Sequence, residues 1–222
     1  MYYRPKIFFP KKSYSMFGED LIINKIFKNK KKGIYVDIGC YHPIEGSNTY
    51  LLFKKGWGGI NIDLNKTSID LFKVARSKDI NLNLAISNKS KKIKYYYRKN
   101  INMLNTINLK FAKNNFLKGF KTSFIQSNTL NSVLKKTHFS KRIDFLNLDI
   151  EGNEINALKS LDFKKYSPKV ICIEMHKTSG RNKKNQLENS LYKFLRKKGI
   201  LLFCSPIQSN LTTIIYLQTT PF

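Results

Sequence analysis

The chain has 222 residues, 41% of them hydrophobic and 13% aromatic, which is enough for one globular domain with a core of its own. It has no run of 18 apolar residues, and its first residues lack the apolar core and cleavage site of a secretory signal, so we expect neither a membrane-spanning helix nor a signal peptide. Its three cysteines are scattered along the chain, which argues against a disulfide framework and predicts a cytoplasmic protein.

The net charge of +27 comes almost entirely from lysine and allows two interpretations. One is the codon bias of an AT-rich coding sequence, spread over a solvated surface. The other is attraction to a polyanion, a phosphate-containing substrate or an anionic membrane face, the last implying peripheral membrane association. Nucleic acid is not the favoured partner, because arginine is rare and only residues 95–98 combine aromatic and basic side chains. A strand packed on the core explains that cluster equally well.

Predicted strands and helices alternate along the chain, which indicates βαβ units and a parallel sheet. Acids at the start and apolar residues at helical spacing predict a first helix from Phe17 to Phe27. In chain order, the next predictions are strand 34–38, a helix capped by Ser47 that ends near Lys55, strand 60–63, helix 67–77, strand 80–86, an added strand 91–97, strand 122–126, helix 129–136, strand 143–149, strand 169–174, helix 185–198, and strands 200–204 and 211–217. The last connection is short enough for a hairpin, so the final strand should be antiparallel to its neighbour.

The pattern predicts a single domain over residues 1–222, with residues 1–32 as an N-terminal arm and helix. Residues 98–121 are polar, rich in Asn and Lys, and show no clean hydrophobic period. Long irregular segments of this kind are often substrate-binding loops. We therefore interpret residues 98–121 as an insertion on the substrate side of the sheet, with a simple ordered loop as the alternative.

Four predicted strands end in or near an acid: Asp37, Asp63, Asp149 and Glu174. Because parallel strands point their carboxyl ends the same way, these side chains should line one edge, where open α/β sheets bind ligands. The glycine turn that begins at Gly39 lacks the further glycines of a dinucleotide fingerprint. A cofactor with a ribose but no pyrophosphate, such as S-adenosylmethionine, suits this turn better.

Six stretches form one joint sequence pattern: Gly18-Glu19-Asp20, Val36-Asp37-Ile38-Gly39, Ser47-Asn48-Thr49-Tyr50, Gly56-Trp57-Gly58-Gly59-Ile60, Ile62-Asp63 and residues 143–154. On these stretches the chain resembles the FkbM-type methyltransferases, a branch of the enzymes that depend on S-adenosylmethionine. The resemblance implies the Rossmann-like class I methyltransferase fold, an α/β fold with a seven-stranded, mostly parallel sheet whose last strand is antiparallel and with helices on both faces. One departure is Ser15-Met16, where the family usually has Ser-Gln.

The resemblance also implies cofactor contacts. The turn after the first strand would hold the methionine part, Asp63 the ribose hydroxyls, and Ala85 and Ile86 would lie beside the adenine. The full set of expected cofactor-binding residues is Glu19, Asp37, Gly39, Asn48, Thr49, Asp63, Ala85 and Ile86. The implied function is O-methylation of a sugar hydroxyl, on a nucleotide-activated or lipid-linked sugar in glycan or polysaccharide biosynthesis. The alternative is a basic protein that binds RNA or another polyanion on the same scaffold, or a cap-type RNA methyltransferase.

A sugar hydroxyl is a poor acid, so the reaction benefits from a base or a metal. The candidate catalytic residues are Asp149, His176, His42 and Glu151. Asp149, Glu174 and His176 could hold Mg²⁺ or Mn²⁺, the alternative being a metal-free site in which Glu174 and His176 pair with each other or with surface lysines. His42 is either a base or a residue that orders the turn with Pro43.

Overall fold

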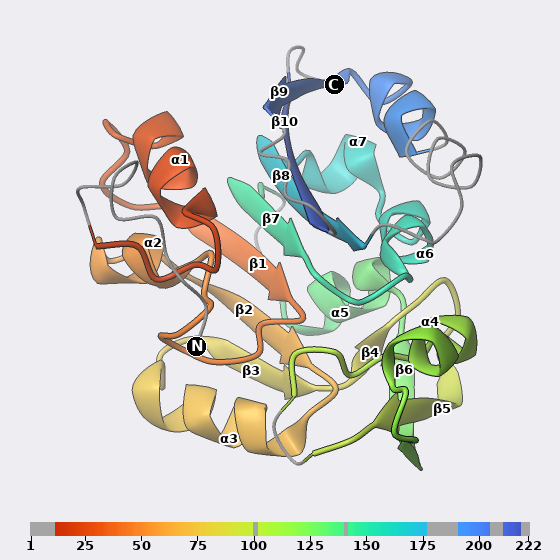
Figure 1. The fold of residues 1–222 in the computed structure, drawn as a ribbon. Coiled ribbons are helices and arrows are strands. Elements are labelled where there is room, and N and C mark those ends of the chain that lie inside the picture. The colour runs from red at the N-terminus through yellow and green to blue at the C-terminus, as the bar shows by residue number, and fades with distance from the viewer. Residues whose placement is uncertain (1–11, 100–101, 140–141, 177–190, 205–210, 219–222) are drawn as a thin grey trace.

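The computed structural model describes residues 12–99, 102–139, 142–176, 191–204 and 211–218 (Figure 1). Its main sheet has the strand order β3-β2-β1-β7-β8-β10-β9. These strands are β1 (Ile34–Ile38), β2 (Gly58–Asp63), β3 (Ile80–Asn83), β7 (Phe145–Leu148), β8 (Val170–His176), β9 (Ile200–Cys204) and β10 (Leu211–Gln218).

Neighbouring strands are parallel among β3, β2, β1, β7 and β8, whereas β10 is antiparallel to both β8 and β9. The predicted α/β fold with a mainly parallel sheet is confirmed, as is an antiparallel final strand. The chain starts at β1, moves outward to β3, and then returns to β7 on the other side of β1. This reversal between β1 and β7 is the switch point at which open α/β sheets bind ligands.

Alternation along β1 separates two cores. Val36 and Ile38 face the cluster that contains α5 (Leu130–Lys136) and α6 (Glu154–Lys159). Tyr35 faces the cluster that contains α1 (Glu19–Ile26) and α2 (Tyr50–Lys54). Helices therefore cover both faces, while α3 (Lys66–Ala75) packs against β2 and β3. Among the described helices, none is both long and apolar enough to cross a membrane.

A second, smaller sheet lies beside the main one, and we call residues 85–128 the small-sheet module. Its strands β4 (Ala85–Ile86), β5 (Lys91–Tyr97) and β6 (Lys121–Asn128) have the order β4-β6-β5. The prediction of one strand over 80–86 was wrong, because Ala85 and Ile86 leave the main sheet and pair with the end of β6. Within residues 98–121 lies an unpredicted helix, α4 (Leu109–Asn115), which the Asn108 side chain caps by accepting from the Phe111 N–H.

Three further predictions differ from the structure or extend beyond its described residues. Ser47 does not cap α2, which follows Thr49 without a side-chain cap; the Ser47 hydroxyl instead accepts from Arg76 at 3.0 Å. The short helix α7 (Phe163–Tyr166) was not among the predicted elements, although the Asp162 side chain caps it. Of the predicted helix 185–198, residues 191–196 are helical, and residues 185–190 lie outside the described residues.

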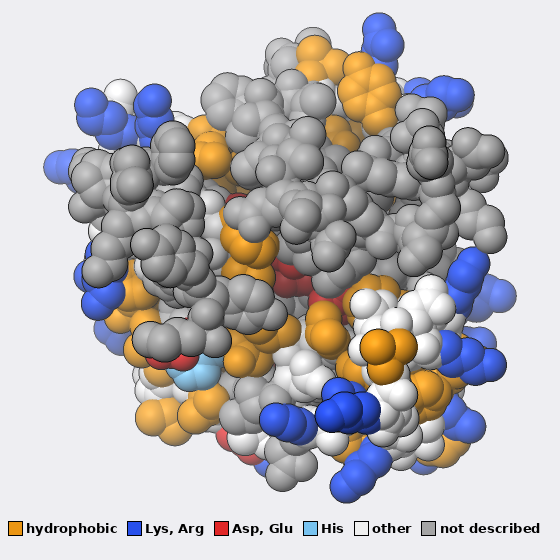
Figure 2. Space-filling view, in the orientation of Figure 1, with side chains coloured by type: hydrophobic (Ala, Val, Ile, Leu, Met, Phe, Trp, Pro, Cys, Tyr) orange, Lys and Arg blue, Asp and Glu red, His pale blue; other side chains and the backbone are white. Residues whose placement is uncertain are grey.

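Charge is unevenly spread over the face drawn in Figure 2. Lys and Arg side chains stand around its periphery, whereas some of the acidic side chains show near its centre. That centre overlies the carboxyl end of the main sheet in the same orientation of Figure 1. Acidic side chains are therefore exposed at this edge of the sheet, inside a periphery of basic side chains.

Candidate functional site

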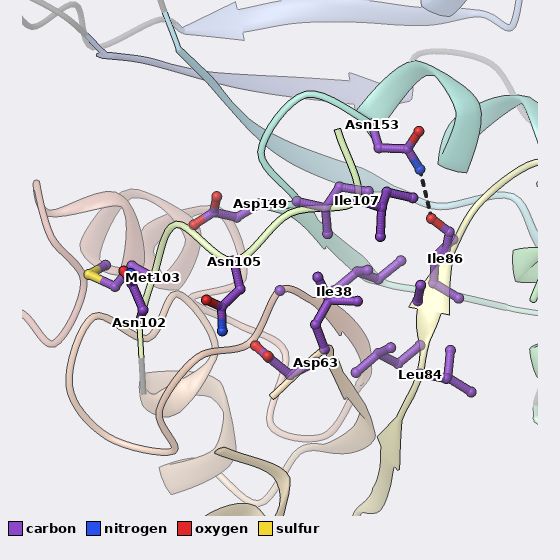
Figure 3. Close-up of a pocket in the computed structure, with 15 residues that line it drawn as sticks. Ile38, Asp63, Leu84, Ile86, Asn102, Met103, Asn105, Ile107, Asp149 and Asn153 are labelled. Atoms are coloured by element: carbon purple, nitrogen blue, oxygen red, sulfur yellow. Dashed lines mark hydrogen bonds between the residues drawn. The ribbon is translucent and has the colours of Figure 1, made fainter. Parts of the chain in front are cut away.

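Two adjoining pockets lie at the carboxyl edge of β1, β2 and β7. The first has an empty volume of about 460 Å³ and the second about 380 Å³. Figure 3 shows the first pocket, which is enclosed by strand-end residues on one side and by residues 102–107 on the other. Gly39, Met103 and Asp149 line both pockets, so the two form one bent site.

Asp63 is the acid that lines the first pocket alone, since Asp149 lines both pockets. One carboxylate oxygen accepts from the Tyr41 N–H at 2.9 Å and the other from the Asn65 N–H at 2.7 Å. Burial raises the pKa of Asp63 to about 6, against the lowering effect of these two hydrogen bonds. Each carboxylate oxygen has a second lone pair, so the fixed group can accept from a pair of ligand hydroxyls once it is ionised.

Gly39 joins the first strand to this site. It has a φ of +79°, and a Cβ atom there would lie 1.7 Å from the carbonyl oxygen of Asp149. Its N–H donates to the Ile62 carbonyl at 2.8 Å, while the Asp149 N–H donates to the Ile38 carbonyl at 2.9 Å. Only glycine satisfies both the left-handed conformation and this close approach, which brings the ends of β1, β2 and β7 together.

Asp149 lies where the two pockets meet. Its Oδ1 is buried and has no hydrogen-bond partner among the described residues. Burial, and then the charges of Glu174, Glu151 and Glu154, raise the pKa of Asp149 well above its usual value. A carboxylate with a raised pKa is a stronger proton acceptor than an ordinary one, which is the property of a general base.

Asp37 forms the buried floor of the second pocket. Its carboxylate accepts from the Thr49 hydroxyl at 2.6 Å and from the Asn147 amide at 2.9 Å, and Asn147 in turn accepts from the Asn48 amide at 3.1 Å. Burial raises the pKa of Asp37, which these two hydrogen bonds oppose. The network fixes Asn48 and Asn147 at the pocket wall.

Arg76 supports this network from behind, and sequence reasoning missed it. It follows α3 and is only 1% exposed. Its guanidinium donates to the hydroxyls of Thr49 at 2.8 Å and Ser47 at 3.0 Å, and to the carbonyl of Pro43. It also lies 4.9 Å from the ring centroid of Phe72. In a chain with 41 basic residues nothing in the sequence distinguishes this one, because its burial depends on three separate segments.

Residues 102–107 form the far wall of the first pocket, and sequence reasoning assigned them no individual roles. Asn105 is 7% exposed, its Oδ1 has no partner among the described residues, and its side chain points toward Asp63 in Figure 3. Thr106 donates its hydroxyl to the Glu151 carbonyl at 2.9 Å and exchanges two backbone hydrogen bonds with Tyr96. The wall is therefore tied to both the β7 loop and β5.

Most predicted cofactor-binding residues reach the pockets. Asp63, Ala85 and Ile86 line the first, Glu19, Asp37 and Asn48 line the second, and Gly39 lines both. Thr49 is the exception, because its fully buried hydroxyl lies between Asp37 and Arg76 and supports the site without lining it.

Of the predicted catalytic residues whose side chains are described, Asp149 lines the pockets, whereas Glu151 and His42 do not. Asp149 lines both pockets, but Glu151 lines neither and is 3% exposed, so it acts on Asp149 through its charge. His42 also lines neither pocket. Its Nδ1 accepts from the N–H groups of Ile44 at 3.2 Å and Glu45 at 3.0 Å, so it orders the turn, as the second of its two predicted roles requires. The His176 side chain lies outside the described part of the structure.

Of the proposed metal ligands, Asp149 and Glu174 both line the second pocket. Within the described residues, no group of three or more His, Cys, Asp or Glu side chains is arranged to hold a metal ion. His176 is not among the side chains tested, so the metal site stays a prediction.

Comparison with known proteins gives two distant structural likenesses and one family. A Haemophilus influenzae protein described as a methylase is 11% identical over 91% of this chain and 88% of its own, with a TM-score of 0.45. The 16S rRNA methylase ArmA is 12% identical over 90% and 82%, with a TM-score of 0.41. No curated protein matches the sequence. The model of the methyltransferase FkbM domain matches residues 37–202, well over half of the chain. The chain therefore belongs to the FkbM methyltransferase family.

Proposed function

We propose that this protein transfers a methyl group from S-adenosylmethionine to a sugar hydroxyl, on a nucleotide-activated or lipid-linked sugar. Use of S-adenosylmethionine follows from the family, and the sugar acceptor from the resemblance described above. The observation that carries the proposal is the bent site itself. A carboxylate suited to a ribose lies in one pocket, and a half-buried carboxylate with a raised pKa lies where that pocket meets the next.

The residues present fit the cofactor. Asp63 would accept from the ribose hydroxyls, and the apolar side chains of Leu64, Ile86 and Ile107 offer walls for the adenine. The second pocket contributes the carboxylates of Glu19, Asp37, Asp149 and Glu174, which complement the positive sulfonium and ammonium groups. The Oδ1 atoms of Asp149 and Asn105, which have no hydrogen-bond partner among the described residues, give the site two acceptors for a ligand.

The cofactor supplies a methyl group already activated for substitution, and the chain must align an acceptor and remove its proton. In our proposal Asp149 accepts the hydroxyl proton, and the nearby charges of Glu174 and Glu151 keep its proton affinity high. Asp37 holds Asn48 and Asn147 in place, while Met103 covers the junction of the pockets and excludes water. Mg²⁺ or Mn²⁺ on Asp149, Glu174 and His176 would assist by polarising the acceptor oxygen.

Calorimetric titration with S-adenosylhomocysteine tests the cofactor half of the proposal. Above the Asp63 pKa of about 6 we expect the wild type to bind and Asp63→Asn to bind about a hundredfold more weakly, because the charged acceptor of the hydroxyls is lost. Asp70→Asn removes an acid that lies exposed on α3 and should bind as the wild type does. Absence of heat with the wild type would falsify the cofactor assignment.

Incubation with labelled S-adenosylmethionine and a panel of nucleotide sugars and lipid-linked sugars tests the acceptor half. Labelled product with a sugar, and its loss in Asp149→Asn, are the expected results. A parallel reaction with EDTA separates the two chemistries, since a reaction that depends on Asp149 alone survives chelation. Label transferred to RNA and to none of the sugars would contradict the proposed acceptor.

A further inference from the structure

The small-sheet module lies inside the longest acid-free part of the chain. Residues 80–143 contain 14 of the 41 Lys and Arg residues and none of the 14 Asp and Glu residues. These 64 residues therefore carry +14 of the net charge of +27, and the other 158 residues carry the remaining +13. The net charge is concentrated here because acids are absent, so the lysines of this segment have no acidic neighbours within it.

One face of the small sheet combines this charge with an exposed ring. Lys92 and Lys94 alternate along β5 and so share a face, and Lys94 pairs directly with Phe124 of β6. The two ammonium groups lie 5.6 and 5.8 Å from the Phe124 ring centroid, and Phe124 is 59% exposed. The ring is therefore presented to solvent between two cations.

The turn after α4 presents an exposed aliphatic side chain beside this face. Leu117 is 89% exposed and lies in the turn closed by the hydrogen bond from the Gly119 N–H to the Phe116 carbonyl. Phe120 follows Gly119, and its ring centroid lies 5.3 Å from that of Tyr96. Side chains alternate along β5, so Tyr96 shares a face with Lys94. The turn that carries Leu117 thus rests on the face that exposes Phe124.

Exposed apolar side chains are unusually frequent in this module. Three of the seven large apolar side chains exposed in the described structure belong to it: Leu109, Leu117 and Phe124. In the view of Figure 2, Lys and Arg side chains stand over the corner where Figure 1 places β5, β6 and α4, with no acidic side chain among them. Apolar side chains set among lysines are typical of surfaces that bind the interface of an anionic bilayer.

We propose that this face of the small-sheet module, centred on Lys92, Lys94, Leu117 and Phe124, docks the protein on an anionic membrane surface. The module has nine lysines and one arginine, whereas base recognition relies on arginine forks. An aliphatic side chain such as Leu117 cannot stack on a base but can insert among lipid headgroups. These two features favour lipid over single-stranded RNA.

Docking would bring the site toward the membrane, because Met103, Asn105 and Ile107 of the same module line the first pocket. A lipid-linked sugar would then be the acceptor within reach. That consequence rests on the proposed function, but the docking surface does not depend on it.

Co-sedimentation with vesicles of equal parts phosphatidylglycerol and phosphatidylcholine, at physiological ionic strength, tests the surface. The wild type should bind these vesicles, not bind pure phosphatidylcholine, and be released by high salt. Lys92→Gln/Lys94→Gln should bind about 30-fold more weakly, which corresponds to about 1 kcal/mol per lysine. Leu117→Ser/Phe124→Ser should bind about tenfold more weakly or worse, because the inserted apolar area is lost.

Matched variants elsewhere control for charge and hydrophobicity alone. Lys31→Gln/Lys32→Gln removes the same charge from an exposed loop, and Val74→Ser removes an apolar side chain that is 84% exposed on α3. Both should bind vesicles as the wild type does, and each variant's thermal unfolding shows that it is folded. Failure of the wild type to bind anionic vesicles, or equal weakening in the Lys31/Lys32 control, overturns the proposal. Binding of a single-stranded RNA oligonucleotide without vesicle binding overturns it in favour of nucleic acid.

Discussion

The carboxyl edge of the main sheet and the small-sheet module carry opposite charges in opposite surroundings. Four acids at or near strand ends, Asp37, Asp63, Asp149 and Glu174, line the pockets at that edge together with Glu19 of α1, and burial raises the pKa of Asp37, Asp63 and Asp149. The module has no acid at all and turns its lysines outward. The chain thus keeps negative charge where a positive cofactor can compensate it and leaves positive charge on the surface for a partner. Three pairs of variants, one of each pair in or behind the pockets and the other in the module, test how far this difference extends to stability.

Glycine substitutions should separate the two regions most strongly. Gly39 and Gly119 have φ values of +79° and +84°, so alanine costs about 1–2 kcal/mol of backbone strain at either position. At Gly119 no atom of the described residues lies within 4 Å of the added Cβ, whereas at Gly39 the Cβ would meet the Asp149 carbonyl at 1.7 Å. We expect Gly39→Ala to unfold in much less urea than Gly119→Ala and to lose S-adenosylhomocysteine binding. Equal urea midpoints would show that the strand ends can separate freely.

Replacing an arginine in each region should give the second-largest difference in stability. Arg76 is 1% exposed and donates to three oxygens of the loop 43–49, whereas Arg98 of the module is exposed. Arg76→Met removes three hydrogen bonds donated to buried oxygens and should lower the free energy of unfolding by about 3 kcal/mol. Arg98→Met should change it by less than about 0.5 kcal/mol. Urea unfolding of both variants gives the comparison, and a loss below about 1 kcal/mol for Arg76→Met would mean that water replaces its hydrogen bonds.

Neutralising charge should have the smallest effect on stability, and only at the carboxyl edge of the main sheet. Asp149→Asn removes a carboxylate that repels Glu174, so it should raise the free energy of unfolding by about 1 kcal/mol at neutral pH while abolishing methyl transfer. Lys92→Gln/Lys94→Gln should leave stability within about 0.5 kcal/mol of the wild type.

The pH dependence of the Asp149→Asn effect has a defined sign. Because the pKa of Asp149 is raised by folding, the folded state holds its proton over a range in which the unfolded state has lost it. Wild-type stability therefore falls as pH rises through that range, and the advantage of Asp149→Asn should grow from acid toward neutral pH. Thermal unfolding across this range measures it; an advantage that is constant with pH would exclude charge repulsion as its cause.

Much of the fold could be predicted because its causes are local. Short apolar runs ending in acids located β1, β7 and β8, and the sequence of β5 alone predicted a strand over 91–97. The split of strand 80–86 and the helix α4 could not be predicted. The first depends on β6, some forty residues further along the chain, and the second lies in a segment without a hydrophobic period.

The site shows the same division. The sequence by itself determined that acids end several parallel strands and that Gly39 opens the first turn, since both follow from residue type and spacing. Only the tertiary structure decided which of these groups face the pockets. It placed Thr49 behind Asp37, committed His42 to the turn, buried Arg76 under the loop 43–49 and brought Asn105 opposite Asp63. Each of these outcomes depends on contacts between segments far apart in the chain, and burial, unlike spacing, is a property that no single segment carries.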